Sequence, residues 1–168
     1  TVSGCDAADS SGGRFSQIDI RSEGLADIIP ENVDAIVHLA ALSTDPMCRD
    51  NAYNCFDVNV MGTLNLINAA QERKAKQFIF ASTEWVYDSF VEGEIKNETS
   101  VVDVQNLTSE YALSKIVSEQ NLRQKYDHGF CPVTILRFGI IYGPRESNWS
   151  AVEGLFNAVK TDDEVAVG

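Results

Sequence analysis

The sequence contains few basic residues and no long apolar run. Its 168 residues include 13 Lys and Arg against 25 Asp and Glu, a formal net charge of −12. Nucleic acids and anionic membrane surfaces attract proteins through Lys and Arg, so this balance argues against both as partners. No apolar segment approaches the roughly 20 residues that span a bilayer, and residues 1–9 lack the pattern of a signal peptide. We therefore expect a cytoplasmic protein that does not enter a membrane.

The sequence also lacks the residue spacing of a metal site. Its four cysteines form no Cys-x-x-Cys pair, and only two histidines are available to complete a cluster. Cys48 and Cys55 are seven residues apart and fit one face of a helix, but a structural zinc ion takes four ligands. We expect no metal, and four free thiols in a reducing compartment.

Short β-branched apolar runs alternate with segments of helical periodicity. Strands are predicted at 14–20, 33–39, 78–81 and 133–137, and helices at 22–29, 51–73 and 107–126. This alternation predicts an α/β fold, a doubly wound parallel sheet covered by helices on both faces and joined by right-handed crossovers. In such sheets ligands bind beyond the carboxyl ends of the strands.

Tyr111 and Lys115 are four residues apart in the predicted helix 107–126, and so lie one turn apart on the same face. A neighbouring ammonium group favours phenolate and lowers the pKa of a tyrosine, which suits general acid–base chemistry. On spacing alone, an exposed Tyr/Lys pair without a function explains the pattern equally well. Ser82 and Thr83 follow strand 78–81, where their hydroxyls would hold a substrate carbonyl or make local turn bonds.

Four further polar residues have two readings each. Asp19 would accept from an adenine amino group or cap a turn, and Asp6 would bind ribose hydroxyls at a strand end or belong to a disordered terminus. His38 lies in an apolar run, which favours a satisfied core histidine over a base. Arg137 would bind phosphate or form a surface ion pair.

Taken in order, six segments resemble the NAD-dependent epimerase/dehydratase family of extended short-chain dehydrogenase/reductases. They cover nearly the whole chain from Asp19 to Arg145. The six segments are Asp19-Ile20, His38–Ala41, Asn59–Thr63, Phe78–Thr83 running into Val86-Tyr87, Tyr111-x-x-x-Lys115, and Leu136–Phe138 leading to Tyr142–Arg145.

The resemblance implies a dinucleotide-binding Rossmann domain that transfers hydride with NAD, NADP remaining an alternative. Tyr111 would be the acid/base, Lys115 would bind the nicotinamide ribose and lower the pKa of Tyr111, and Thr83 would hydrogen-bond the reacting oxygen. Asn59 would brace the loop beneath the cofactor. The resemblance places the following residues at the cofactor: Asp6, Asp19, Ile20, Leu39, Ala40, Ala41, Asn59, Ser82, Tyr111, Lys115 and Phe138.

The resemblance also implies that the chain is truncated at both ends. The family's glycine-rich first turn, GxxGxxG, is absent, and Ser11-Gly12-Gly13 lacks its spacing. A Rossmann sheet without its first strand would have a central gap. We expect a partial NAD(P)-binding domain over residues 1–147 and the start of a substrate-binding lobe over 148–168. Family members often pair through the two long helices, so we also expect a homodimer.

The family suggests a small-molecule substrate, a nucleotide-linked sugar. Ile140 stands where many sugar-nucleotide enzymes have a substrate-binding Asn, and Trp85 stands where the dehydratases have Glu, which leaves Glu84 without an acidic partner. These departures argue against 4,6-dehydration. An NAD(P)-dependent epimerase or oxidoreductase is the leading interpretation. The alternatives are a reductase or dehydrogenase of a non-nucleotide carbonyl compound and a non-catalytic dinucleotide-binding module.

Overall fold

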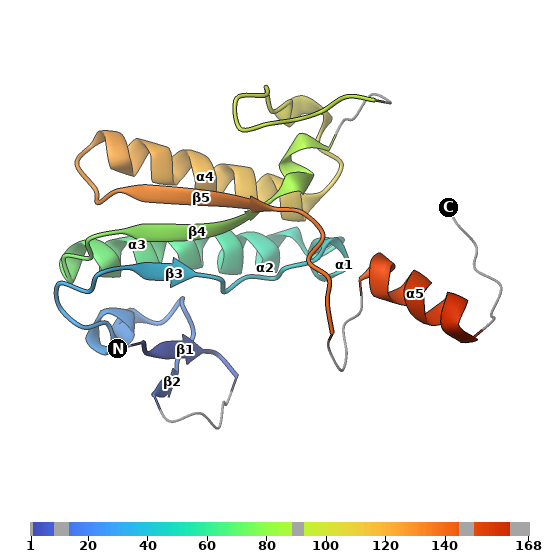
Figure 1. Cartoon of the computed structure of the whole chain (residues 1–168). Helices are drawn as coiled ribbons and strands as arrows, with labels where there is room; N and C mark the ends of the chain where they lie inside the picture. Colours follow the sequence, from blue (N-terminus) through green and yellow to red (C-terminus); the bar gives the residue numbers. More distant parts are fainter. Residues whose placement is uncertain (1, 9–13, 89–92, 145–149, 162–168) are drawn as a thin grey trace. The chain divides into compact units, whose positions relative to one another are not determined.

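The computed structural model describes residues 2–8, 14–88, 93–144 and 150–161, and it divides into two compact units, Thr1–Arg137 and Phe138–Gly168 (Figure 1). The first unit holds both sheets except for the last residue of the final strand. The second holds the helix α5, Ala151–Thr161. This division falls before the boundary expected at residue 147. That the residues from 148 onward begin a substrate-binding lobe stays a prediction.

Within the described residues, five strands form two separate sheets (Figure 1). Their bounds are β1 Gly4–Asp6, β2 Phe15–Gln17, β3 Ile36–His38, β4 Phe78–Thr83 and β5 Val133–Phe138. β1 pairs in parallel with β2, and the second sheet has the order β3-β4-β5. β3 and β4 are parallel, with Ile36 opposite Phe78 and His38 opposite Phe80. The predicted strands are therefore present, although β2 and β3 are shorter than expected.

The two sheets are separated where the sequence predicts a gap. In the doubly wound order 3-2-1-4-5-6, one strand lies between strand 2 and strand 4. Among the described residues no strand joins β1 to β3, and a cavity of about 740 Å³ is lined by residues of both, including Cys5, Ile36 and Val37. The predicted α/β fold with parallel strands is confirmed, and the described strands leave a gap between β1 and β3 where the sequence predicts one.

The helices follow the predicted positions, with one interruption. The helix expected over 51–73 consists of three consecutive segments, and the one expected over 107–126 is a single helix. The helical elements of the first unit are the 3-10 helix η1 Glu23–Ile28, α1 Asp45–Cys48, α2 Ala52–Phe56, the π-helical η2 Asp57–Met61, α3 Gly62–Glu72, the 3-10 turns η3 Glu84–Tyr87 and η4 Val104–Asn106, and α4 Glu110–Asp127.

The core lies on one face of the second sheet, where α3 and α4 pack against it. Phe78 and Phe80 on β4 are 0% and 1% exposed, and they cluster with Ile67 of α3 and Leu122 of α4. Val37 has its side chain on the other face and is 56% exposed. Right-handed crossovers that step in one direction along a sheet place their helices on the same face. The expected covering on both faces is therefore not found in the described part of the chain.

Candidate active site

The carboxyl end of β4 carries two buried hydroxyls and leads into a short 3-10 turn. Thr83 is the N-cap of η3, where its hydroxyl accepts a hydrogen bond from the backbone N–H of Trp85 (3.2 Å) and donates to Glu84 Oε2 (3.3 Å). A side-chain oxygen in this position satisfies an N–H that the turn leaves unpaired. Thr83 is 5% exposed, so its hydroxyl is fixed in a largely dry environment.

The helix α4 places Tyr111 and Lys115 beside this strand end. Ser109 caps the helix, its hydroxyl accepting from the N–H of Ala112, so the helix begins one residue before Tyr111. Lys115 is 4% exposed and its Nζ donates to the carbonyl oxygen of Ala81 at 2.8 Å. The same Nζ lies 5.8 Å from the centre of the Tyr111 ring. The phenol and the ammonium group therefore share one face of α4, as their spacing predicts.

The electrostatics of Tyr111 differ from the sequence-based expectation. Burial raises the pKa of its phenol, the Glu84 carboxylate raises it further, and a side-chain hydrogen bond with Thr83 opposes both. Burial also lowers the pKa of the Lys115 ammonium to about 8. The lowered pKa predicted for Tyr111 is not found, because desolvation of the phenol is the largest effect on its pKa. The Thr83 hydroxyl lies close enough to the phenol to oppose this rise, and Lys115 is on the same face of α4, so the three residues predicted to be catalytic meet at one place.

Asn59 links the loop after β3 to α4. Its side chain accepts from the N–H of Leu42 (2.8 Å) and donates to the carbonyl of Leu42 (3.0 Å) and to the hydroxyl of Ser114 (2.9 Å). Asn59 lies in the π-helical η2, a local widening that is frequent at functional sites. Its bonds hold the chain directly after Leu39–Ala41, which is the segment that the resemblance places at the cofactor.

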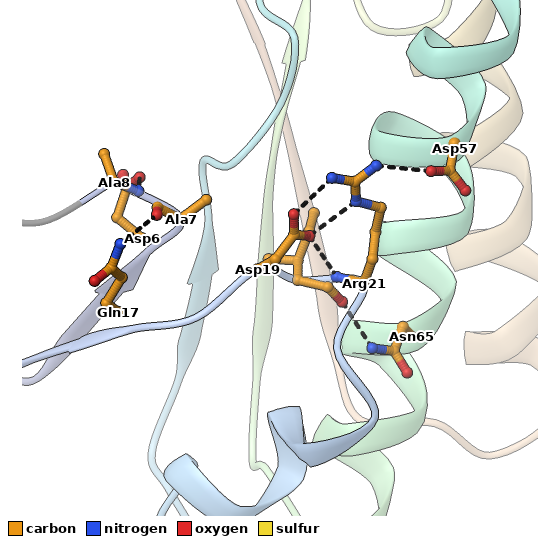
Figure 2. Close-up of polar contacts among 9 residues, drawn as sticks. Asp6, Ala7, Ala8, Gln17, Asp19, Arg21, Asp57 and Asn65 are labelled. Atoms are coloured by element: carbon orange, nitrogen blue, oxygen red, sulfur yellow. Dashed lines mark hydrogen bonds and ion pairs between the residues drawn. The ribbon is translucent and has the colours of Figure 1, made fainter.

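A second polar cluster lies at the ends of β1 and β2 (Figure 2). Asp6 ends β1, and its Oδ1 accepts from the N–H of Ala8 at 2.9 Å, so this residue lies at a strand end and is not disordered. Asp19 is bound by Arg21 through both the side chain and the backbone, and this hydrogen bonding lowers the pKa of the Asp19 carboxyl. Arg21 also donates to Asp57 of η2 at 2.7 Å.

These acidic residues line the cavity between the two sheets. Its walls include Asp6, Asp19 and Ile20 together with Leu39–Ala41 of the loop after β3. Ala40 and Ala41 have small side chains, and Leu39 is 66% exposed. This cavity is the gap between β1 and β3, where the doubly wound order places another strand, so its volume alone does not define a ligand site.

Ser82 and Phe138 are also predicted to contact the cofactor, but neither lines the cavity described above. The hydroxyl of Ser82 donates to Glu119 Oε1 at 2.6 Å, so its polar group is used within the protein. Phe138 is the first residue of the second unit and is 39% exposed. Their roles at the cofactor stay predictions. Arg145, which the resemblance includes in its last segment, lies outside the described residues.

Glu119 is not among the site residues predicted from the sequence, although its spacing from Tyr111 and Lys115 indicates that it lies on the same side of the helix. It lies four residues after Lys115 and eight after Tyr111, hence on the same stripe of α4. Glu119 is 0% exposed and is paired with Arg137 of β5, whose Nη2 lies 2.6 Å from its Oε2. The sequence left phosphate binding and a surface ion pair open for Arg137. The structure shows an ion pair, and this pair is buried.

His38 is a core histidine, as the sequence favours. It is 2% exposed, its Nε2 lies 2.8 Å from the hydroxyl of Thr63, and burial lowers its pKa to about 3. A neutral imidazole held in this way supports the packing of β3 against α3 and does not exchange protons near neutral pH.

Neither a metal site nor a membrane span is found in the part of the chain that the structure describes. All four cysteines are free thiols, and no three His, Cys, Asp or Glu side chains converge on a common point. None of the described helices is both long enough and apolar enough to cross a bilayer.

The parallel strands with their helices, and the Thr83–Tyr111–Lys115 group beside the carboxyl end of β4, define a Rossmann-type α/β domain with a short-chain dehydrogenase arrangement. The model of the NAD dependent epimerase/dehydratase family matches residues 2–167, and the chain belongs to this family.

Its relatives catalyse different reactions. The chain is 30% identical over 135 residues to a dTDP-D-glucose 4,6-dehydratase of Homo sapiens, covering 79% of this chain and 37% of that protein. It is 33% identical over 118 residues to a 3beta-hydroxysteroid dehydrogenase/Delta(5)-Delta(4) isomerase of Caenorhabditis elegans, covering 69% and 25%. The solved UDP-glucose 4-epimerase of Thermus thermophilus in complex with NAD superimposes with a TM-score of 0.77 at 28% identity, covering 94% and 51%. The chain thus spans between a quarter and about half of these proteins.

Proposed function

We propose that this chain carries the catalytic centre of an NAD(P)-dependent epimerase or oxidoreductase that acts on a hydroxyl group of a nucleotide-linked sugar. The observation that supports this proposal is the meeting of Thr83, Tyr111 and Lys115 at the carboxyl end of β4. Residues from two elements, 28 or more positions apart in the sequence, converge there, and Thr83 and Lys115 are only 5% and 4% exposed. An exposed Tyr/Lys pair without a function would not show that burial.

Each of the three residues has a separate task in this proposal. Tyr111 moves the proton of the substrate hydroxyl, acting as base in one direction and as acid in the other. Thr83 hydrogen-bonds the reacting oxygen and holds it against the phenol. Lys115 supplies a positive charge that stabilises the phenolate when the proton leaves. Because burial raises the pKa of Tyr111 in the chain alone, a positively charged group bound beside it would bring that pKa toward neutrality.

NAD fits the residues that line the cavity. Asp6 at the end of β1 would accept hydrogen bonds from the ribose hydroxyls, and its negative charge would favour NAD over the 2′-phosphate of NADP. Asp19 and Ile20 would flank the adenine, and Leu39–Ala41 would lie along the cofactor backbone. A bound NAD would supply the hydride acceptor and donor that oxidation and re-reduction of the substrate carbon require.

The names of two relatives support a nucleotide-linked sugar as substrate, and two residues of this chain argue against particular substrates or reactions. The human dehydratase and the Thermus epimerase are both named for nucleotide-linked glucose. Trp85, 45% exposed beside Glu84, cannot act as the second acid of a dehydratase. Ile140 cannot hydrogen-bond a sugar nucleotide, and the Caenorhabditis elegans relative is named for a steroid. A dehydrogenase or reductase of a non-nucleotide carbonyl compound is therefore the second candidate.

One experiment separates the candidates. The protein is incubated with NAD and UDP-glucose or dTDP-glucose in one series, and with reduced nicotinamide and simple ketones in another. The proposal predicts isomerised sugar without net change in the cofactor. Net oxidation of reduced nicotinamide by a ketone would establish the second candidate. Tight cofactor binding with turnover in neither series would leave a non-catalytic dinucleotide-binding module.

We further propose that the protein forms a homodimer through α2–α3 and α4. Tyr53 on α2, Met61 on η2 and Tyr126 on α4 are 87%, 56% and 56% exposed, so these helices present apolar and aromatic side chains to the solvent. Sedimentation of the wild-type chain and of Tyr53→Glu tests this. A dimer that the substitution disrupts is expected, and a wild-type monomer at micromolar concentration would contradict it.

A further inference from the structure

A buried ion pair connects α4 to both strands that flank the candidate site. Arg137 of β5 donates to Glu119 twice, from Nε to Oε1 (3.0 Å) and from Nη2 to Oε2 (2.6 Å). Ser82 of β4 donates to the same Oε1 at 2.6 Å. Glu119 is 0% exposed and Ser82 is 4% exposed, so the carboxylate is fully enclosed and has three donors.

The other end of the guanidinium binds the segment that follows Thr83. Nη1 of Arg137 donates to the hydroxyl of Tyr87 at 2.6 Å, and the guanidinium lies 4.8 Å from the centre of the Tyr87 ring. The Tyr87 hydroxyl in turn donates to the carbonyl of Asn97 at 2.8 Å. Arg137 therefore fixes η3, which begins directly after Thr83, relative to α4.

Three residues on one stripe of α4 contact three consecutive residues at the end of β4. The stripe residues are Tyr111, Lys115 and Glu119, at intervals of one turn. The Tyr111 phenol lies beside the Thr83 hydroxyl, which lowers its pKa. Lys115 donates to the Ala81 carbonyl at 2.8 Å, and the Glu119 carboxylate accepts from the Ser82 hydroxyl at 2.6 Å. The contact of Glu119 thus constrains how far α4 can slide along β4.

An enclosed ion pair is not explained by stability alone. Removing two charges from water is costly, and a well-packed apolar pair of the same volume is often at least as stable. Apolar contacts are non-directional, however, whereas a bidentate Arg–carboxylate pair defines both distance and orientation. Such a pair in this place serves to select one register of the helix against the strand.

We propose that Glu119, held by Arg137, is a positioning residue that sets the register of α4 against the end of β4 and so maintains the contact between Tyr111 and Thr83. This inference rests on the proposed function for its catalytic consequence. Its structural content is independent of turnover and can be measured in the protein without substrate.

The test follows the titration of the Tyr111 phenol by NMR in protein labelled with ¹³C at the ζ carbon of tyrosine, the signal being assigned with Tyr111→Phe. Ser82→Ala and Glu119→Asp are used because neither changes the charge of the site. The Thr83 hydroxyl beside Tyr111 lowers the pKa of the phenol, so a slipped helix raises the titration midpoint of Tyr111, by about half a pH unit or more.

Two controls keep the result specific. Ser118→Ala removes another buried hydroxyl of α4, which binds the carbonyls of Asn59 and Ser114, and it should leave the midpoint unchanged. In a Thr83→Val background, Ser82→Ala and Glu119→Asp should add no further shift. The proposal is overturned if both variants keep the wild-type midpoint, or if their shifts persist in full without the Thr83 hydroxyl. Should Glu119→Asp fail to fold, Ser82→Ala decides alone.

Discussion

The ammonium group of Lys115 donates its hydrogen bond to the carbonyl oxygen of Ala81, at 2.8 Å, and is almost completely buried there. A carbonyl dipole compensates a buried positive charge less well than a carboxylate would. The pKa of Lys115 is accordingly lowered to about 8. This lysine therefore loses its proton close to the physiological range, and that property has a measurable consequence.

The stability of the protein should rise with pH above about 8 because of Lys115. Between that value and the ordinary pKa of lysine, the unfolded chain binds one more proton than the folded chain. The free energy of unfolding then increases by up to about 1.4 kcal/mol per pH unit relative to a variant without the group. Urea unfolding of wild type and Lys115→Met from pH 7 to 10 measures the difference. Parallel pH profiles for the two proteins would contradict the buried, carbonyl-bound lysine.

Thr83 should be replaceable by Ser but not by Val. Valine removes the hydroxyl that contacts Tyr111 and caps η3, whereas serine retains it. Loss of one positioned hydrogen bond to a reacting oxygen typically lowers turnover by about 10²-fold or more. Steady-state turnover of both variants with the substrate found for the wild type provides the measurement. Equal rates for Thr83→Val and wild type would remove Thr83 from the catalytic centre.

Asp6 should determine the preference for NAD over NADP. Asp6→Asn removes the negative charge that, in the proposed site, binds the ribose hydroxyls and repels a 2′-phosphate. NAD affinity should therefore fall by about tenfold, and the difference between the affinities for NAD and NADP should become smaller. Asp27→Asn is the control, since its carboxylate is 82% exposed and pairs with Arg73. Calorimetric titration with both cofactors checks this. An unchanged NAD/NADP ratio in Asp6→Asn would show that Asp6 does not contact the ribose.

Gly62 should not accept a side chain, because Ile20 occupies the space. A methyl group there would lie 2.6 Å from Cδ1 and 2.7 Å from Cγ1 of Ile20, the residue expected beside the adenine. Gly62→Ala should cost about 1–3 kcal/mol of stability and weaken cofactor binding.

Gly154 of α5 gives the matched control for that substitution, since it is also helical and no atom lies within 4 Å of a methyl group at its position. Gly154→Ala should be neutral or slightly stabilising, by up to about 1 kcal/mol. Thermal unfolding and cofactor titration of both variants are compared. Equal stability and equal cofactor affinity of Gly62→Ala and Gly154→Ala would contradict the close packing of Ile20 against Gly62.

Much of the fold could be predicted because the local spacing of apolar residues indicates where helices and strands form. The β-branched run at 33–39 and the aromatic run at 78–81 are short and apolar, and both are strands in the structure. The sequence predicts a continuous helix over 51–73, since side-chain spacing does not distinguish α-helical from π-helical turns. The π-helical part η2 adjusts the positions of Asn59 and Gly62 toward distant partners, Ser114 and Ile20, that periodicity does not encode.

The candidate site could be predicted only in part, for the same reason. Tyr111 and Lys115 are one turn apart, so their proximity follows from sequence spacing. Glu119 depends on Ser82 and Arg137, which lie 37 and 18 residues away, and no local pattern pairs them. The raised pKa of Tyr111 also required the structure, because the opposing effects of burial and hydrogen bonding are tertiary.

The most direct test of the proposed chemistry compares the wild-type protein with Tyr111→Phe. Cofactor affinity is measured by titration with NAD, and chemistry by the rate at which a nucleotide sugar reduces the bound nicotinamide or is isomerised. We predict unchanged affinity and a rate lower by about 10²–10⁴-fold, since the phenyl ring fills the same space but cannot transfer a proton. A Tyr111→Phe protein that converts substrate at the wild-type rate would contradict the assignment of Tyr111 as the acid/base.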